Sequence, residues 1–255
     1  MELLFREMKS MTTHLRRLIV AASVFALTGS AIAGGPQKPK ELTTTEQVLE
    51  RFIDALGGRE AIEKLETRVC LGRETTDFPS YEPPVYESKN IQAKAKIPRS
   101  TLYTTLVDSY GEKTGYNGSI GWAQDKCGIR RDDYVKTAKF HWIVNPHNAL
   151  LIEEYYPDLT FAGKKEMKGH IVYALEPAAL DPLYWGLYFD VNSGLLVGIG
   201  FYWDLEDYRP VDGVLFPHRI LTSRKGGQTW WEFFEVKHNV PINDSLFNMP
   251  SEKGN

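Results

Sequence analysis

The chain has 255 residues, 42% of them hydrophobic, and a formal net charge of −3 at pH 7. A weakly acidic chain is not attracted electrostatically to DNA, RNA or an anionic membrane, so none of these is expected as a partner. The length is sufficient for one domain with a sizeable core.

The first 33 residues have the pattern of a secretory signal peptide. Arg16 and Arg17 supply positive charge, residues 18–27 form an apolar run too short to span a bilayer, and the AIA sequence at 31–33 offers a cleavage site. We expect cleavage after Ala33, a periplasmic or secreted location, and no transmembrane span in the mature chain. An uncleaved membrane anchor is the alternative. Removal of the leader would change the net charge to −5, because it contains four basic and two acidic residues.

A flexible linker is expected at 34–41, followed by one domain over 42–250. A helix is predicted to begin near Thr43, because Thr43 and Glu46 have the spacing of a capping box. Apolar residues at positions 48, 49, 52, 53 and 56 follow the helical period, and Gly57-Gly58 ends the pattern. A short second helix is predicted over about 59–65.

After Glu66 the hydrophobic pattern changes to the period of two that is typical of strands. A helix is predicted over 146–156, where Pro146 suits its first position. Short hairpin signals such as Asp212-Gly213 separate the later strands and require antiparallel neighbours. The fold class is therefore α+β, with one curved, mostly antiparallel sheet. Strands are predicted at 67–75, 86–97, 102–107, 114–122, 160–166, 170–176, 184–191, 195–203, 214–223 and 228–238.

Several of these strands carry wide apolar strips. In the strand over 195–203, alternate residues from Leu195 to Trp203, including Val197 and Phe201, form one such face. On the last strand, Trp231 and Phe233 lie on one face and Trp230, Phe234 and Val236 on the other. Strands that are apolar on both faces must be covered on both. The candidate residues for lining a ligand cavity are Trp185, Phe189, Phe201, Trp203, Trp231 and Phe233; an ordinary filled β core is the alternative.

The order of several short motifs resembles the LolA-like periplasmic lipoprotein carriers and the related outer membrane lipoprotein-sorting homologues. The first helix ends in ALGG at 55–58, and YNG at 116–118 precedes Gly121-Trp122. The hairpin YFD at 188–190 continues into SGLL at 193–196, and DYRPVDGV spans 207–214. Asn239-Val240-Pro241 resembles the family's ending. The likeness runs through about 200 residues from the first helix to the C-terminus.

This resemblance implies an incomplete, strongly curved antiparallel β-barrel with helices across its concave face. It also implies an apolar interior that accepts acyl chains without catalysis. The motifs contain no counterpart of the arginine thought to gate the cavity of the true carriers, so the resemblance concerns the fold more than lipoprotein cargo.

No catalytic, metal or cofactor site is predicted. The nucleophile elbow, the phosphate-binding loops and the HExxH zinc pattern are missing from the sequence. His141 and His147 with Glu153 or Glu154 have poor spacing for a metal. Three carboxylates, Asp204, Glu206 and Asp207, fit a solvated loop better than an acid–base pair.

Cys70 and Cys127 are the only cysteines. In an oxidising compartment they could form one disulfide, whereas two buried free thiols are the alternative.

The sequence thus favours non-catalytic binding, with or without transport, of a lipid or other hydrophobic molecule in the bacterial envelope. A structural or protein-interaction module with a filled core is the first alternative, with an envelope protein or lipoprotein as its partner; an unrecognised hydrolase is the second. An open cavity above ~300 Å³ would favour binding, and side chains that fill the hollow would favour the module.

Overall fold

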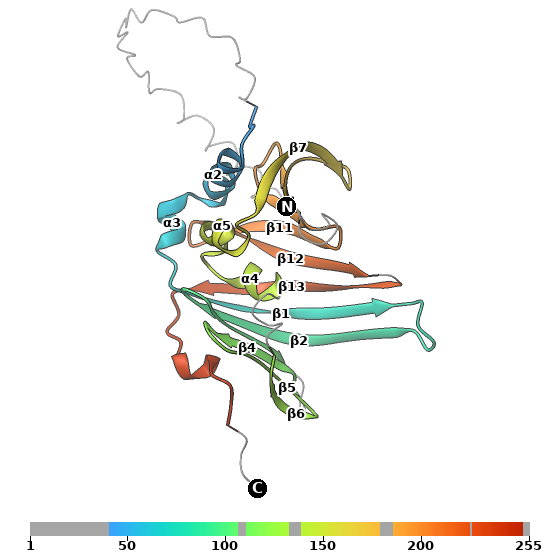
Figure 1. Ribbon diagram of the computed structural model, residues 1–255. Coiled ribbons are helices and arrows are strands. Elements are labelled where there is room, and N and C mark those ends of the chain that lie inside the picture. Colours follow the sequence, from blue (N-terminus) through green and yellow to red (C-terminus); the bar gives the residue numbers. More distant parts are fainter. Residues whose placement is uncertain (1–40, 107–110, 133–138, 179–185, 225, 252–255) are drawn as a thin grey trace, which may run out of the picture. The chain divides into compact units, whose positions relative to one another are not determined.

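The structure is a computed structural model that describes residues 41–106, 111–132, 139–178, 186–224 and 226–251 (Figure 1). The predicted leader and nearly all of the predicted linker lie outside these residues. The helices are α2 (Thr45–Leu56), α3 (Arg59–Glu63), α4 (Lys139–Val144) and α5 (Ile152–Tyr155), with 3-10 turns η2 (Asn148–Leu151) and η3 (Asp244–Phe247). The strands are β1 (Thr67–Phe78), β2 (Val85–Lys96), β3 (Ser100–Leu106), β4 (Lys113–Asn117), β5 (Gly121–Asp125), β6 (Gly128–Arg131), β7 (Leu159–Met167), β8 (His170–Pro177), β9 (Leu187–Asp190), β10 (Leu196–Ile199), β11 (Trp203–Val211), β12 (Val214–Arg224) and β13 (Gly227–His238).

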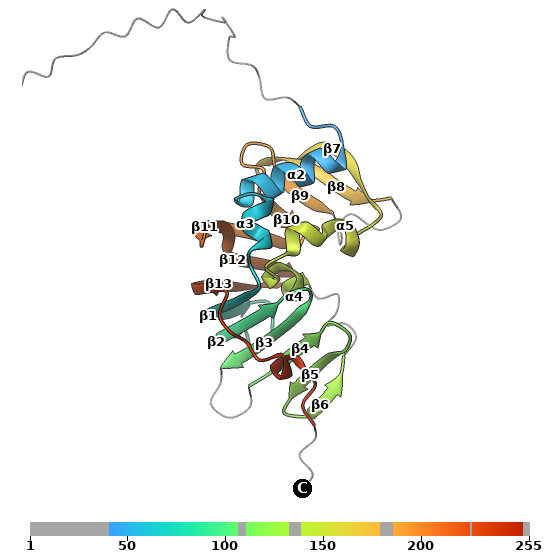
Figure 2. The same cartoon turned by 90° about the vertical axis from the view of Figure 1, so that its left-hand side faces the viewer.

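All thirteen strands belong to one sheet, in the order β6-β5-β4-β3-β2-β1-β13-β12-β11-β10-β9-β8-β7. Every paired neighbour is antiparallel, and the pairing of β1 with β13 joins the two halves of the chain at the middle of the sheet. Within the described residues the edge strands β6 and β7 do not pair with each other. The sheet is therefore a curved, open half-barrel, which confirms the predicted fold class (Figure 2).

Helix α2 is capped by Thr44, whose hydroxyl accepts a hydrogen bond from the backbone N–H of Gln47 at 3.3 Å. The prediction had placed the cap one residue earlier, at Thr43. The helix ends at Gly57 and Gly58, whose φ angles of 126° and 91° strongly favour glycine. Its apolar stripe is buried as predicted: Val48, Leu49, Phe52, Ile53 and Leu56.

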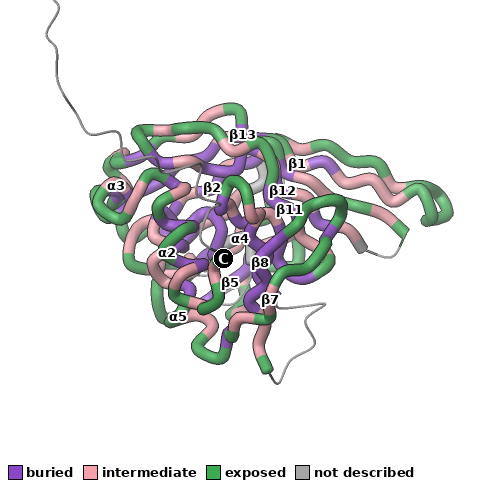
Figure 3. Tube along the Cα trace, turned by 90° about the horizontal axis from the view of Figure 1, so that it is seen from above, coloured by how far each residue is buried: buried purple, intermediate pink, exposed green. Residues whose placement is uncertain are grey.

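The helices cover one face of the sheet, which we call the concave face. One hydrophobic cluster contains the buried residues of α2, α4 and α5 together with strand residues such as Cys70, Ile91 and Phe216. Figure 3 shows that buried residues gather where helices and strands meet, whereas the far end of the β1–β2 hairpin is intermediate or exposed. A smaller second cluster, of Met167, Val172, Ala174 and Tyr188, lies apart from the first.

Several predicted elements differ from the structure, and strands β6 and β11 were not predicted. The strand expected over 114–122 is a hairpin, β4 and β5, that turns at Gly118, where φ is 93°. The strand expected over 195–203 ends at Ile199, and a tight turn at Gly200 leads into β11. The helix expected over 146–156 is shorter and starts as the 3-10 turn η2, while α4 before it was not predicted.

Bulges also change the predicted faces. Between Leu196 and Gly198 the register with β9 shifts, so Val197 packs against the second cluster and Ile199 against the first. On β13, Phe234 is the extra residue of a bulge opposite Leu71 and Gly72, and it is 66% exposed. Val236 therefore pairs with Cys70 on the concave side, the same side as Trp231 and Phe233, which corrects the expected alternation.

Both cysteines are free. Cys70 is buried on β1, whereas Cys127 is exposed in the turn between β5 and β6. The disulfide that the sequence allowed is therefore not formed. The alternative of two buried free thiols is correct for Cys70 and wrong for Cys127. Within the described ranges, no helix combines the length and the apolar character needed to cross a membrane.

Candidate functional site

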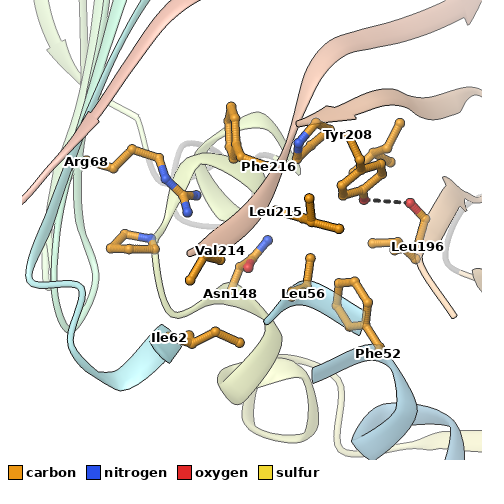
Figure 4. A pocket seen from close by; sticks show the side chains of 13 residues that line it. Phe52, Leu56, Ile62, Arg68, Asn148, Leu196, Tyr208, Val214, Leu215 and Phe216 are labelled. Carbon is orange, nitrogen blue, oxygen red and sulfur yellow. Dashed lines mark hydrogen bonds between the residues drawn. The ribbon is translucent and has the colours of Figure 1, made fainter. Parts of the chain in front are cut away.

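Figure 4 shows the side chains that line a cavity between α2, α3 and the strands of the concave face. This cavity has a volume of about 10 Å³, roughly the smallest space that holds one water molecule. This part of the molecule therefore corresponds to the predicted alternative of a filled core. The lining residues are Phe52, Leu56, Ile62, Arg68, Pro146, Asn148, Leu196, Leu205, Tyr208, Val214, Leu215, Phe216 and Pro217.

Arg68 is a buried cation within this apolar region. Its guanidinium lies 4.3 Å from the centroid of the Phe216 ring, and its Nε donates a hydrogen bond of 2.9 Å to Nε2 of His238. Its Nη1 donates longer bonds, of 3.4 and 3.5 Å, to the backbone carbonyls of Val144 and Asn145. Burial lowers the pKa of Arg68 to about 10. Arg68 thus connects strand β1 to the C-terminal end of α4.

His238 accepts this hydrogen bond in its neutral form. Burial, and then the nearby charge of Arg68, lower the pKa of His238 to about 4, although Asp212 opposes the shift. The Nδ1 atom of His238 lies 3.3 Å from an oxygen of Asp212. In the hydrogen-bonded pair of Arg68 and His238, the positive charge therefore lies on Arg68.

Further along the strands, two tryptophans mark the end of the apolar core. The rings of Trp203, on β11, and Trp231, on β13, are stacked, with centroids 5.5 Å apart and an interplanar angle of 4°. Trp231 belongs to the main cluster, whereas Trp203 is half-buried and packs against that cluster. Trp203 therefore leaves part of an aromatic surface exposed directly beside the buried core.

A carboxylate lies beside this pair. Oε2 of Glu74 accepts hydrogen bonds from the Tyr103 hydroxyl at 2.5 Å and from Nε1 of Trp231 at 2.8 Å. Oε1 lies 3.8 Å from Nζ of Lys89. Burial, and then the charge of Glu74, raise the pKa of Tyr103, so its hydroxyl remains a donor. We call Glu74, Lys89, Tyr103, Trp203 and Trp231 the Trp–Glu cluster.

Strand alternation places this cluster at the boundary of the helix-covered core. On β2, Ile91, Ala93 and Ala95 are fully buried, and Lys89 continues their phase with a side chain that is 24% exposed. On β1, Arg68 and Cys70 are buried, whereas the side chain of Glu74 is 14% exposed. Polar hydroxyls follow beyond it, where Thr76 and Thr229 lie 3.2 Å apart.

The six residues predicted to line a cavity do not all meet. Phe189 packs edge-on against Phe52 of α2, and Phe233 packs against Phe216, so both belong to the filled core. Phe201 is 47% exposed and contacts Tyr188 of the second cluster. Trp185 lies outside the described residues. Of the five that the structure describes, only Trp203 and Trp231 come together at the boundary of the core.

The residues weighed for acid–base or metal chemistry are dispersed. Asp204, Glu206 and Asp207 lie on strand β11, not in a loop, and each has its own cation: Lys168, Arg219 and Arg209 respectively. His147 precedes the 3-10 turn η2 and Glu153 lies in helix α5, and the side chain of His141 is not among those described. Across the described parts of the chain, no group of three or more metal-ligating side chains comes together.

Sequence reasoning missed Arg68, Glu74 and Tyr103. Each is a single polar residue in a strand, and none belongs to a motif. The only signal in the sequence was a charged residue on the strand face that its buried neighbours share. Glu74, two residues after Gly72, is an example.

The arrangement of the sheet has close parallels among solved structures. A LolA superfamily protein from Nitrosomonas europaea aligns with a TM-score of 0.54 at 12% identity, over 81% of this chain and 98% of that chain. An outer membrane lipoprotein-sorting protein domain from Vibrio parahaemolyticus aligns with a TM-score of 0.52 at 10% identity, over 80% of this chain and 97% of that one. The chain has a LolA-like fold.

A DUF1329 family protein from Desulfovibrio piger shares this LolA-like fold, with a TM-score of 0.54 at 10% identity over 80% of this chain and 96% of that chain. No protein-family model and no curated protein matches the sequence itself. The predicted resemblance is thus confirmed for the fold.

Proposed function

We propose that the protein binds a lipid or other hydrophobic molecule on its concave face without catalysing a reaction. We place this binding, with or without transport, in the bacterial envelope, because the first 33 residues resemble a cleaved signal peptide. The LolA-like fold supports the proposal because the solved structures that share it include an outer membrane lipoprotein-sorting protein domain.

The stacked pair of Trp203 and Trp231 is the observation that carries the proposal. The half-buried Trp203, stacked on the buried Trp231 at the edge of the core, offers an apolar surface that a ligand can cover. An acyl chain laid against them would gain about 0.8 kcal/mol for each CH₂ removed from water. The stack is also held in place, because Nε1 of Trp231 donates to Glu74.

The nearly filled space beneath α2 favours a second candidate. With only about 10 Å³ free there, a chain cannot enter that region unless α2 moves. A module that holds a protein partner would need no such space. The two candidates differ in whether an isolated apolar probe binds.

A fluorescence titration with the neutral apolar probe N-phenyl-1-naphthylamine tests the proposal. The wild-type protein should enhance the probe's emission and saturate. Trp203→Ala should weaken binding at least about tenfold, because one large aromatic surface is worth ~1.5–3 kcal/mol. Phe234→Ala is the matched control, since Phe234 is an exposed ring at the bulge of β13. Equal binding by both variants, or no saturable binding at all, would favour the protein-interaction module.

A further inference from the structure

The two oxygens of the Glu74 carboxylate are not equivalent. Oε2 accepts two hydrogen bonds, from Tyr103 and Trp231, and is fixed by them. Oε1 is only within ion-pair range of Lys89, at 3.8 Å, beyond the length of a hydrogen bond. A carboxylate oxygen can accept about two hydrogen bonds. Oε1 therefore retains the capacity to accept a donor from a ligand.

The charges around Oε1 favour a positive ligand group. Nζ of Lys89 lies 3.8 Å from Oε1 of Glu74 and 3.7 Å from Oε2 of Glu87, so the two carboxylates share it. Glu87 lies two residues before Lys89 on β2 and therefore on the same face of the strand. These three described side chains together carry a net charge of −1. A cation at Oε1 would lie beside carboxylates that Lys89 alone does not neutralise.

The stacked tryptophans complete the arrangement. Nε1 of Trp231 lies 2.8 Å from Glu74, so the indole edge and the carboxylate belong to one surface. Aromatic faces attract ammonium groups, most strongly when the site is partly desolvated. An apolar chain and a cationic end group would therefore find complementary partners side by side.

We propose that the ligand is a cationic amphiphile, whose alkyl chain covers Trp203 and Trp231 and whose protonated amine donates to Oε1 of Glu74. This inference rests on the proposed binding function and specifies the chemical class of the ligand. In the alternative, the Glu74 network only ties β3, β1 and β13 together. A purely structural Glu74 would contribute to stability but would not distinguish between ligand end groups.

Three C12 ligands with different ends test the inference: dodecylammonium, 1-dodecanol and dodecanoate, each below its micellar concentration at pH 7. They compete against N-phenyl-1-naphthylamine on the full chain. For the wild type, dodecylammonium should displace the probe at a concentration about tenfold or more below that of dodecanoate, as expected for one hydrogen bond to a charged group. Glu74→Gln should remove this preference, so that dodecylammonium and dodecanoate displace the probe at similar concentrations.

Glu176 provides a matched control carboxylate. It is similarly buried, with a side chain 12% exposed, and it also accepts from a tyrosine, Tyr188, and pairs with a lysine, Lys165. Glu176→Gln should keep the wild-type preference. A second variant, Lys89→Met, removes the competing cation and should increase the preference for dodecylammonium, which keeps the inference testable if Glu74→Gln does not fold.

The outcomes separate the two levels of the proposal. Tight displacement by all three chains with no preference would overturn the inference and leave the binding function standing. A preference that survives in Glu74→Gln would also overturn it. Failure of all three chains to displace the probe, or failure of the probe to bind, would overturn the binding function itself.

Discussion

At the scale of single residues, the two thiols lie in opposite environments. Burial raises the pKa of Cys70 to about 12, because a thiolate there would lose its hydration. Cys127 is exposed in the β5–β6 turn. Only the thiolate reacts with alkylating reagents at a useful rate. We therefore expect native protein treated with iodoacetamide at pH 8 to gain a single adduct, at Cys127.

Intact-mass spectrometry and peptide mapping measure this directly. Denaturation before alkylation is the control and should give two adducts. No adduct under non-reducing conditions would indicate a disulfide between Cys70 and Cys127 and would contradict the structure. Two adducts in the native state would mean that β1 is not buried as described.

His238 should make stability depend on pH. Its folded pKa, about 4, lies below the unfolded value near 6.5, so the unfolded state binds more protons between these limits. The contribution is fully present above pH 6.5 and is lost as the pH falls toward 4. Protonation would also place a proton on Nε2, the atom that accepts from Arg68. The urea midpoint of the wild type should therefore decrease from pH 7 to pH 4.5.

Two variants separate His238 from other titrating groups. His238→Gln keeps an acceptor but does not titrate, so its midpoint should decrease less over the same range. His170→Gln is the control, because the side chain of His170 is 55% exposed. If His238→Gln loses stability as steeply as the wild type, then His238 is not the residue responsible.

The residue scale is also where sequence reasoning was weakest. The bonds from Arg68 to His238 and from Glu74 to Trp231 join positions about 160–170 apart in the sequence. Such pairs depend on strand order and register, which a single sequence does not contain. The tryptophans were found because their chemical type is conspicuous, whereas their polar partners were not.

At the scale of elements, α2 acts as a hydrophobic cover for the concave face. Phe52 is buried, and its ring meets Phe189 at a centroid distance of 5.2 Å. Phe52→Ala should lower the free energy of unfolding by about 3–5 kcal/mol, since it removes buried ring surface and leaves a cavity. Phe234→Ala, at an exposed ring, should change it by less than about 0.5 kcal/mol. Urea denaturation followed by circular dichroism measures both; equal effects would contradict the docking of α2.

Element boundaries followed the sequence where local chemistry determines them. The end of α2 at Gly57-Gly58 was predicted, as was the hairpin turn at Asp212-Gly213, because these positions require positive φ. The faces of residues that follow a bulge were not predicted correctly, because one extra residue reverses the alternation of side chains along the strand. Val197 and Val236 were assigned to the wrong faces for this reason.

At the scale of the whole sheet, β1 and β13 lie at the centre and β6 and β7 at the edges. Central strands are paired on both sides, so their amides exchange only through large-scale opening. Hydrogen exchange should therefore be slowest in β1 and β13 and fastest in β6 and β7. Mass spectrometry of peptic fragments measures this order. Protection of β6 equal to that of β1 would indicate that the β6 edge is covered by a partner or another segment.

The curved, open sheet places the half-buried Trp203, stacked on the buried Trp231, at the boundary of its helix-covered core. The proposed function requires a hydrophobic molecule to bind there. The most direct measurement is mass spectrometry of an organic extract from protein purified natively from its own envelope, without detergent. We predict a stoichiometric amphiphile in the wild-type extract and its loss in Trp203→Ala. An extract that contains no such molecule, from protein that binds none of the C12 ligands, would contradict the account and leave a scaffold with a filled core.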